Sequence, residues 1–215
     1  MGITVSALVD RAIESAGLLE VLTARRNGSL SVSHIEHLRQ ADLLALGALA
    51  DRVRSEEVGA EVRVYTSSPP ETGDAVLLLP FDGTSAALQR RGQNEGDAQL
   101  TGLELLREVA VSRVAGPRAA RVRVDWTRCG LELAQVALGF GANELVGVIA
   151  TKRGLPIAPG DLAGVGKKSR LLPAQLVKRK ELAGYVRRAG REPVFIGPEE
   201  AGDAIHTATT LEEAP

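Results

Sequence analysis

The chain has 215 residues, of which 44% are hydrophobic and 25% charged, and its formal net charge is −1. This composition is that of an ordinary globular protein and excludes wholesale disorder. The near-zero charge argues against a protein that coats nucleic acid with its whole surface. Aromatic residues make up only 3% of the chain, which argues against a stacking platform for single-stranded nucleic acid. We therefore expect one domain, or one domain plus a small appendage, with an aliphatic core.

The amino-acid composition also limits the possible metal sites and membrane-spanning segments. The single cysteine, Cys129, cannot form an internal disulfide, a four-cysteine zinc site or a three-cysteine iron–sulfur site. His34 and His37 share one predicted helix face, but no third ligand is in view, so we predict no metal site. No run approaches the ~18 apolar residues of a membrane span, and the N-terminal sequence has no basic leader. We expect a cytoplasmic protein.

The first 58 residues predict a helical segment. Apolar residues recur at helical spacing over 4–24, with a soft point at Gly17. Ser33 and Glu36 have the spacing of a capping box and predict the start of a short helix. Asp42 is a predicted N-cap for a longer helix that ends near Gly59.

From residue 59 to 150 the pattern changes to alternating strands and helices. Strands are predicted at 61–66, 75–81, 121–126 and 144–150, and helices at 101–114 and 130–140. Short connections between them are typical of parallel βαβ units, which predicts an α/β core. We expect the N-terminal helices to cover one face of the sheet and the two later helices to cover the other.

The remaining chain divides by charge. Residues 151–196 hold eleven Lys and Arg against three acidic residues, and predict a basic loop followed by a helix at 173–189. A solvated basic helix is the common case for such a segment, so we expect no nucleic-acid binding, and a nucleic-acid binder with a basic patch is kept as an alternative. The tail, 197–215, is acidic, with five Asp and Glu and no Lys or Arg. The predicted organisation is thus 1–58, 59–150, 151–196 and 197–215.

Four stretches resemble a known enzyme family. Residues 101–113 (TGLELLREVAVSR) and 126–147 (WTRCGLELAQVALGFGANELVG) are similar to the C-terminal third of radical S-adenosylmethionine (SAM) enzymes of the aminofutalosine synthase group. Residues 41–54 are similar to the helix before the first barrel strand of that family, and 172–194 to its closing helix. The resemblance implies a partial (β/α) barrel with about four strands, ordered 61–66, 145–150, 120–126 and 75–81. It also implies a link to menaquinone biosynthesis by the futalosine route.

The sequence departs from this family where its chemistry begins. In the family, the first strand leads into a Cys-x-x-x-Cys-x-x-Cys loop that binds an iron–sulfur cluster, and further βα units follow. Here eight residues, 67–74, join two predicted strands, and they contain no cysteine. We therefore expect no iron–sulfur cluster and a ligand-binding or partner protein, not a complete enzyme. A split enzyme whose cluster lies on another chain is the alternative. The eight residues reach at most about 28 Å, which just permits the parallel order, while antiparallel pairing of 61–66 with 75–81 also fits.

Candidate binding residues follow from the same architecture. Ligands of α/β sheets bind beyond the carboxyl ends of the strands, where Asp82, Trp126, Arg128 and Lys152 are predicted to lie. Asn143 occupies the place where the family usually has paired aspartates, although a turn role also explains it.

Assembly is predicted from the strand edges. A partial barrel leaves an edge with unpaired backbone groups, so we predict a homodimer or a complex with a barrel-containing partner. The contact is expected at strand 75–81 or at the N-terminal helices.

Overall fold

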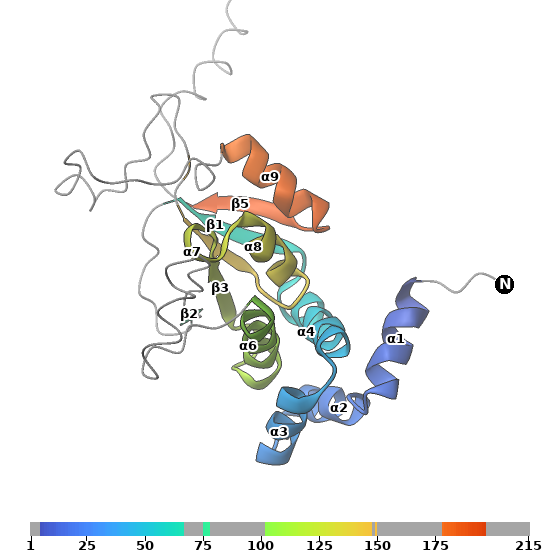
Figure 1. The fold of residues 1–215 in the computed structure, drawn as a ribbon. Coiled ribbons are helices and arrows are strands. Elements are labelled where there is room, and N and C mark those ends of the chain that lie inside the picture. The colour runs from blue at the N-terminus through green and yellow to red at the C-terminus, as the bar shows by residue number, and fades with distance from the viewer. Residues whose placement is uncertain (1–4, 67–74, 78–101, 148, 150–177, 197–215) are drawn as a thin grey trace, which may run out of the picture.

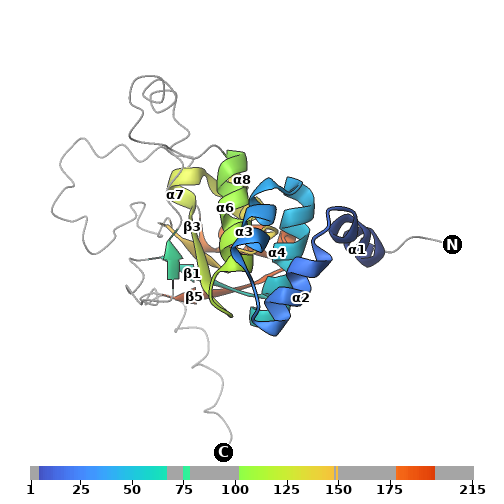
Figure 2. The same cartoon turned by 90° about the horizontal axis from the view of Figure 1, so that it is seen from below.

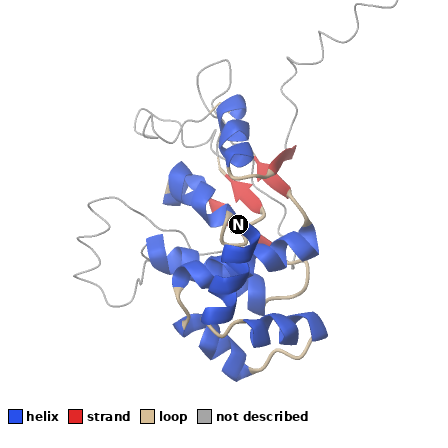
Figure 3. Cartoon of the chain, turned by 90° about the vertical axis from the view of Figure 1, so that its right-hand side faces the viewer, coloured by secondary structure: helices blue, strands red, loops and turns tan. Residues whose placement is uncertain are grey.

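The computed structural model of the chain describes residues 5–66, 75–77, 102–147, 149 and 178–196 (Figure 1). Most of the described chain is helical and accompanies a small sheet (Figure 3). The helices are α1 (Val5–Ser15), α2 (Leu19–Asn27), α3 (Val32–Gln40), α4 (Leu43–Val58), α6 (Gly102–Ala115), α7 (Trp126–Cys129), α8 (Leu131–Leu138) and α9 (Arg179–Arg188). The strands are β1 (Glu61–Tyr65), β2 (Ala75–Leu77), β3 (Arg121–Asp125), β4 (Glu144–Val146) and β5 (Glu192–Ile196).

The N-terminal helices begin and end close to the predicted signals. Gly17 separates α1 from α2 with a φ of 69°, a left-handed conformation that glycine adopts at low cost. The carboxylate of Asp42 accepts hydrogen bonds from the backbone N–H groups of Leu44 and Ala45, which confirms it as the N-cap of α4. The predicted capping box at Ser33 is wrong by two residues. Ser31 caps α3, because its hydroxyl accepts from the N–H of His34 while the His34 ring accepts from the N–H of Ser31.

The described strands form one parallel sheet in the order β2-β3-β4-β1-β5. This confirms the α/β fold class and the predicted order of the first four strands, including the parallel direction of β1 that the sequence left open. The connection between β1 and β2 therefore crosses two intervening strands. A fifth strand, β5, pairs in parallel with the outer side of β1, so β1 lies inside the sheet.

One face of the sheet carries the apolar residues, and the helices lie on that face (Figure 2). Val62, Val64, Val122, Val124 and Leu145 share a single buried cluster with residues of α2, α4, α6, α8 and α9. The expectation that the helices divide between the two faces is therefore wrong. Helices α1 and α3 form an outer layer, where they contact α4 and α6 respectively. Alternation along the strands then directs their polar residues to the opposite face, on which none of the described helices packs.

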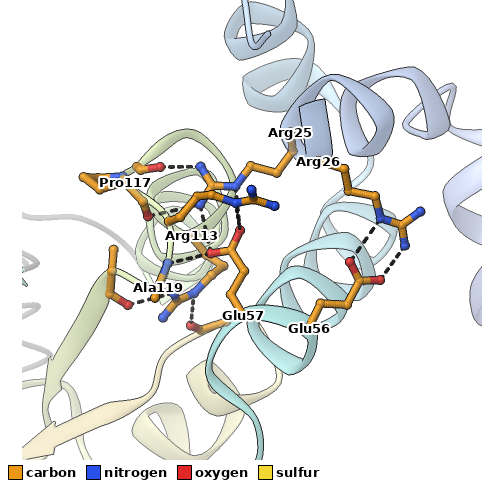
Figure 4. A network of polar contacts seen from close by, with 11 residues as sticks. Arg25, Arg26, Glu56, Glu57, Arg113, Pro117 and Ala119 are labelled. Carbon is orange, nitrogen blue, oxygen red and sulfur yellow. Dashed lines mark hydrogen bonds and ion pairs between the residues drawn. The ribbon is translucent and has the colours of Figure 1, made fainter. Parts of the chain in front are cut away.

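Buried arginines tie these layers together (Figure 4). Arg113 of α6 is fully buried and donates to the carbonyl oxygens of Gly141 and Ala120 and to the amide Oδ1 of Asn143, at 2.7–2.8 Å. Burial lowers the pKa of Arg113 to about 10, so the guanidinium stays charged at neutral pH. Gly141 is required beside it, since a Cβ there would lie 2.8 Å from Arg113 Cβ.

The boundaries predicted at residues 58, 150 and 196 stay predictions. The N-terminal helical segment nevertheless shares its apolar core with the sheet, through residues such as Leu18, Leu38 and Leu46. Residues 78–101, 150–177 and 197–215, which include a predicted loop and the acidic tail, lie outside the described part of the chain.

Candidate functional site

The carboxyl end of β3 holds two of the predicted ligand-binding residues. Trp126 begins the one-turn helix α7, which the carboxylate of Asp125 caps by accepting from the N–H and hydroxyl of Thr127 at 2.8 and 2.6 Å. Arg128 lies 3.5 Å from the Asp125 carboxylate, and 57% of its side chain is exposed. Arg128 is thus an exposed cation at this end of the strand.

Trp126 is packed inside the core. Only 1% of its surface is exposed, and a Cβ on Gly147 would lie 2.3 Å from the indole Cε2. The glycine therefore lets the indole lie directly against the strand that follows. The indole N–H has no hydrogen-bond partner among the described residues. A stacking role for Trp126 stays a prediction, and the described contacts give the ring a packing role.

Asn143 lies at the opposite, amino end of the sheet, directly before β4. Its side-chain oxygen accepts from the backbone N–H of Val122 at 2.8 Å and from Arg113 at 2.7 Å. The structure thus separates Asn143 from Trp126 and Arg128 by the length of the strands. Asp82 and Lys152 lie outside the described residues, so their predicted roles stay predictions.

The face of the sheet opposite the helices carries a charged network that the sequence analysis did not assign. Glu144 is fully buried, and its carboxylate lies 2.7 Å from Nη2 of Arg123 and 3.6 Å from Nε of Arg121. The hydroxyl of Tyr65 donates to the same carboxylate at 3.4 Å, and the Arg123 guanidinium lies 5.1 Å from the centre of the Tyr65 ring. Buried charges persist where such partners compensate the loss of water.

The strand register explains why these residues meet. Arg63, Glu144 and Arg123 stand side by side on β1, β4 and β3. Hydrogen bonds to Glu61 and Tyr65 raise the pKa of Arg63 above its ordinary value, although burial alone lowers it. The signal was present in the sequence, because E-V-R-V-Y and R-V-R-V-D place an ionisable or polar residue at every second position. The order of the strands in the sheet was also needed, because it shows that the polar residues of β1, β4 and β3 lie next to one another.

The two candidate metal ligands of α3 have local partners. The His34 ring takes part in the capping box, and Nε2 of His37 lies 3.2 Å from the carbonyl oxygen of Ala16. No group of three or more His, Cys, Asp or Glu suited to a metal occurs within the described ranges.

Cys129 does not fit the iron–sulfur cluster that the resemblance would otherwise imply. Its thiol lies in α7 and donates to the carbonyl oxygen of Gly130 at 3.4 Å. Burial, with a smaller contribution from the negative charge of Asp125, raises its pKa to about 12, so the thiol is protonated at neutral pH. A cluster needs several thiolates, and this chain offers one cysteine in its neutral form.

Three arginines of the described C-terminal part contact their own chain. Arg179 and Arg188 lie over the rings of Phe195 and Tyr185, at 4.5 and 4.4 Å. Arg191 forms an ion pair with Asp51 of α4. The ion pair of Arg191 ties the turn between α9 and β5 to α4, whereas the two ring contacts lie within α9 and β5. No helix in the described part of the chain is long and apolar enough to cross a membrane.

Two curated proteins are similar to parts of this chain. A 5-amino-6-(D-ribitylamino)uracil–L-tyrosine 4-hydroxyphenyl transferase from Methanosarcina mazei is 31% identical over 146 residues, which cover 61% of this chain and 37% of the transferase. A cyclic dehypoxanthine futalosine synthase from Streptomyces coelicolor is 28% identical over 99 residues, which cover 46% of this chain and 22% of the synthase. No protein-family model matches the chain.

Both relatives are radical SAM enzymes, so the comparison supports a relationship of this chain to the radical SAM superfamily. The chain spans little more than a third of the transferase and less than a quarter of the synthase. The shared sequence therefore covers only part of each enzyme.

Proposed function

We propose that this chain is a radical-SAM-like protein without an iron–sulfur cluster of its own, which binds a ligand or a partner protein in menaquinone biosynthesis by the futalosine route. The similarity to a futalosine synthase supports the pathway. One observation carries the proposal most directly. Only nine residues, 66–74, separate β1 from β2, which leaves no room for a cluster-binding loop followed by further βα units.

The alternative is a split enzyme, in which a second chain supplies the cluster and the missing barrel strands. The parallel sheet supports this alternative, because a sheet of five parallel strands could be closed into a barrel by further parallel strands from a second chain. In both cases the partner contains a barrel or part of one. A homodimer would also pair the backbone N–H and C=O groups at the edge of the sheet.

The geometry of the sheet favours β2 as the contact with such a partner. At the other edge, the N–H of Glu192 donates to Ala60 and the carbonyl oxygen of Ile196 accepts from Thr66, so these residues of β5 face inward to β1. By alternation Pro193 faces outward, and proline has no N–H to donate. The β5 edge therefore lacks a hydrogen-bond donor that an added strand would need. Within the described sheet β2 pairs only with β3, so an added strand would bind beside β2.

The charged face of the sheet is the surface on which we place ligand binding. Its carboxyl end holds Asp125 and, on α7, the exposed Arg128, which is suited to a carboxylate or phosphate group. The buried network around Glu144 would hold this face rigid. In the sequence-based prediction Asp82 follows the strand 75–81 and Lys152 follows the strand 144–150, so both are expected at this end of the sheet, and we retain them in the proposed site.

Anaerobic reconstitution with iron and sulfide tests the absence of a cluster. We expect the protein to remain colourless, to retain no stoichiometric iron and to release no 5′-deoxyadenosine from SAM under reducing conditions. The C129S variant is the matched control and should behave identically. A visible charge-transfer band that C129S abolishes would contradict the proposal.

Light scattering and hydrogen exchange test the assembly. We expect a homodimer, or a stable complex with a barrel-containing protein recovered from native lysate. In that assembly the backbone amides of residues 75–77 should exchange more slowly than in the dissociated chain. If SAM cleavage arises only when the recovered partner is added, the split enzyme is favoured. If the protein is a monomer at about 10⁻⁵ M and no partner is recovered from lysate, both the homodimer and the complex with a barrel-containing protein are contradicted.

A further inference from the structure

A pocket lies at the amino ends of the strands, opposite the end where Trp126 and Arg128 are found. Its volume is about 370 Å³, within the range of small-ligand sites. It is lined by Val58, Glu61, Arg63, Ala119, Arg121 and Asn143. The pocket is therefore formed where α4 leads into β1, where the chain enters β3, and by the residue that precedes β4.

Two guanidinium groups line this pocket from either side of Asn143. Arg63 lies on β1 and Arg121 on β3, and β4 runs between these two strands. Burial lowers the pKa of Arg63, but its hydrogen bonds to Glu61 and Tyr65 raise it by more, and like any arginine it is charged at neutral pH. Arg121 is mostly buried and lies 3.6 Å from Glu144. Guanidinium groups present several N–H donors in one plane, an arrangement that matches the oxygens of phosphate and carboxylate.

The polar groups between the arginines are also placed for recognition. The Oδ1 of Asn143 is engaged by Val122 and Arg113, and its Nδ2 forms no hydrogen bond with another described residue. This fixes the amide and leaves its NH₂ group as a donor. Glu61 contributes a half-exposed carboxylate 3.4 Å from Nε of Arg63. A carboxylate repels a bare anion but accepts hydrogen bonds from hydroxyl groups.

We propose that this pocket binds a small phosphate monoester that carries free hydroxyl groups, such as a sugar phosphate. Arg63 and Arg121 bind the phosphate oxygens, the amide of Asn143 donates to the same group, and Glu61 accepts from a hydroxyl. The site differs from the one proposed above, because it lies at the other end of the sheet from Arg128 and requires no partner chain. It also gives a binding role to Asn143, which the sequence analysis named as a candidate binding residue.

Isothermal titration calorimetry of the full chain tests this site with three probes: ribose 5-phosphate, inorganic phosphate and ribose. We expect ribose 5-phosphate to bind at or below about 1 mM, inorganic phosphate to bind about tenfold more weakly, and ribose not to bind. The R63Q variant should weaken ribose 5-phosphate by about tenfold or more. R187Q is the matched control, since Arg187 is an exposed arginine 3.8 Å from Glu192, and it should bind as the wild type does.

The E61Q variant separates specific recognition from general attraction of anions. Removing the carboxylate should strengthen the binding of inorganic phosphate and reduce the preference for ribose 5-phosphate over phosphate. This change of preference does not depend on the folding of R63Q. The absence of ribose 5-phosphate binding by the wild type, or an equal loss in R63Q and R187Q, would overturn the proposal. An unchanged preference in E61Q would do the same.

Discussion

The substitution of Glu57 by glutamine tests how the N-terminal helices are attached to the core. The carboxylate of Glu57 accepts from Nε and Nη2 of Arg25 on α2, at 2.9 and 3.0 Å, and from the N–H of Ala119 at 2.8 Å (Figure 4). Arg25 also donates to the carbonyl oxygens of Gly116 and Pro117. One ion pair thus joins α2, α4 and the turn before β3.

The expected loss of stability is large because both partners are buried. The side chains of Arg25 and Glu57 are 6% and 10% exposed, so E57Q leaves the charge of Arg25 in a site that water barely reaches. Removing one partner of such a pair typically costs about 3–5 kcal/mol. We expect about 3 kcal/mol for E57Q, since glutamine keeps an acceptor oxygen and Arg25 keeps its two backbone acceptors. The measurement is urea denaturation at pH 7, followed by circular dichroism.

The neighbouring residue provides a matched control. Glu56 forms the same kind of pair with Arg26 of α2, but these side chains are 39% and 46% exposed. Exposed pairs contribute little, so E56Q should cost no more than about 1 kcal/mol. The two variants remove the same charge from adjacent positions of one helix. Equal losses in E56Q and E57Q would refute the argument that burial decides the contribution.

The pH dependence gives a second check on the same residue. Burial raises the pKa of Glu57, but the hydrogen bonds from Arg25 and from the N–H of Ala119 outweigh it, so the pKa lies below its ordinary value. A lowered pKa in the folded state contributes stability above the unfolded pKa of about 4.3, and this contribution is lost as the pH falls through the folded value. The difference in the free energy of unfolding between wild type and E57Q should therefore be largest at pH 7 and decrease as the pH falls below the pKa of Glu57. A difference that persists unchanged well below the pKa of Glu57 would contradict the ion-pair explanation.

Three further predictions concern residues that follow β3 in the chain. G147A should destabilise the chain by about 1–3 kcal/mol and shift the emission of the single tryptophan, because the new methyl group would overlap the Trp126 ring. In G184A, within α9, the nearest atom to the new methyl is 3.5 Å away, so unfolding should require slightly more urea. Cys129, whose pKa is raised to about 12, should react with iodoacetamide much more slowly when folded than in denaturant, as measured by mass spectrometry. Equal labelling rates would show that its thiol is not protected.

The sequence by itself determined the elements and much of their arrangement. Helical spacing, the N-cap Asp42 and the glycine at position 17 predicted the N-terminal helices, because capping and backbone freedom are local properties. The resemblance predicted the order of four strands, and the alternation around residues 61–66 and 121–126 predicted strands there. The residues at the carboxyl end of β3 were also placed correctly at that end of the sheet.

The tertiary structure decided which face each residue occupies and which residues meet. Periodicity shows that a strand has two different faces, but it does not show on which side a distant helix packs, so the helices were wrongly divided between the faces. The buried carboxylate of Glu144 and the pocket beside Arg63 depend on three strands lying in register, although those strands are separated by many residues in the chain. Asn143 shows the same limit, since the sequence places it directly before a strand, but only the fold shows that its side chain binds Arg113 and the N–H of Val122. Local patterns determine local geometry, whereas a site is made by contacts between segments that only folding brings together.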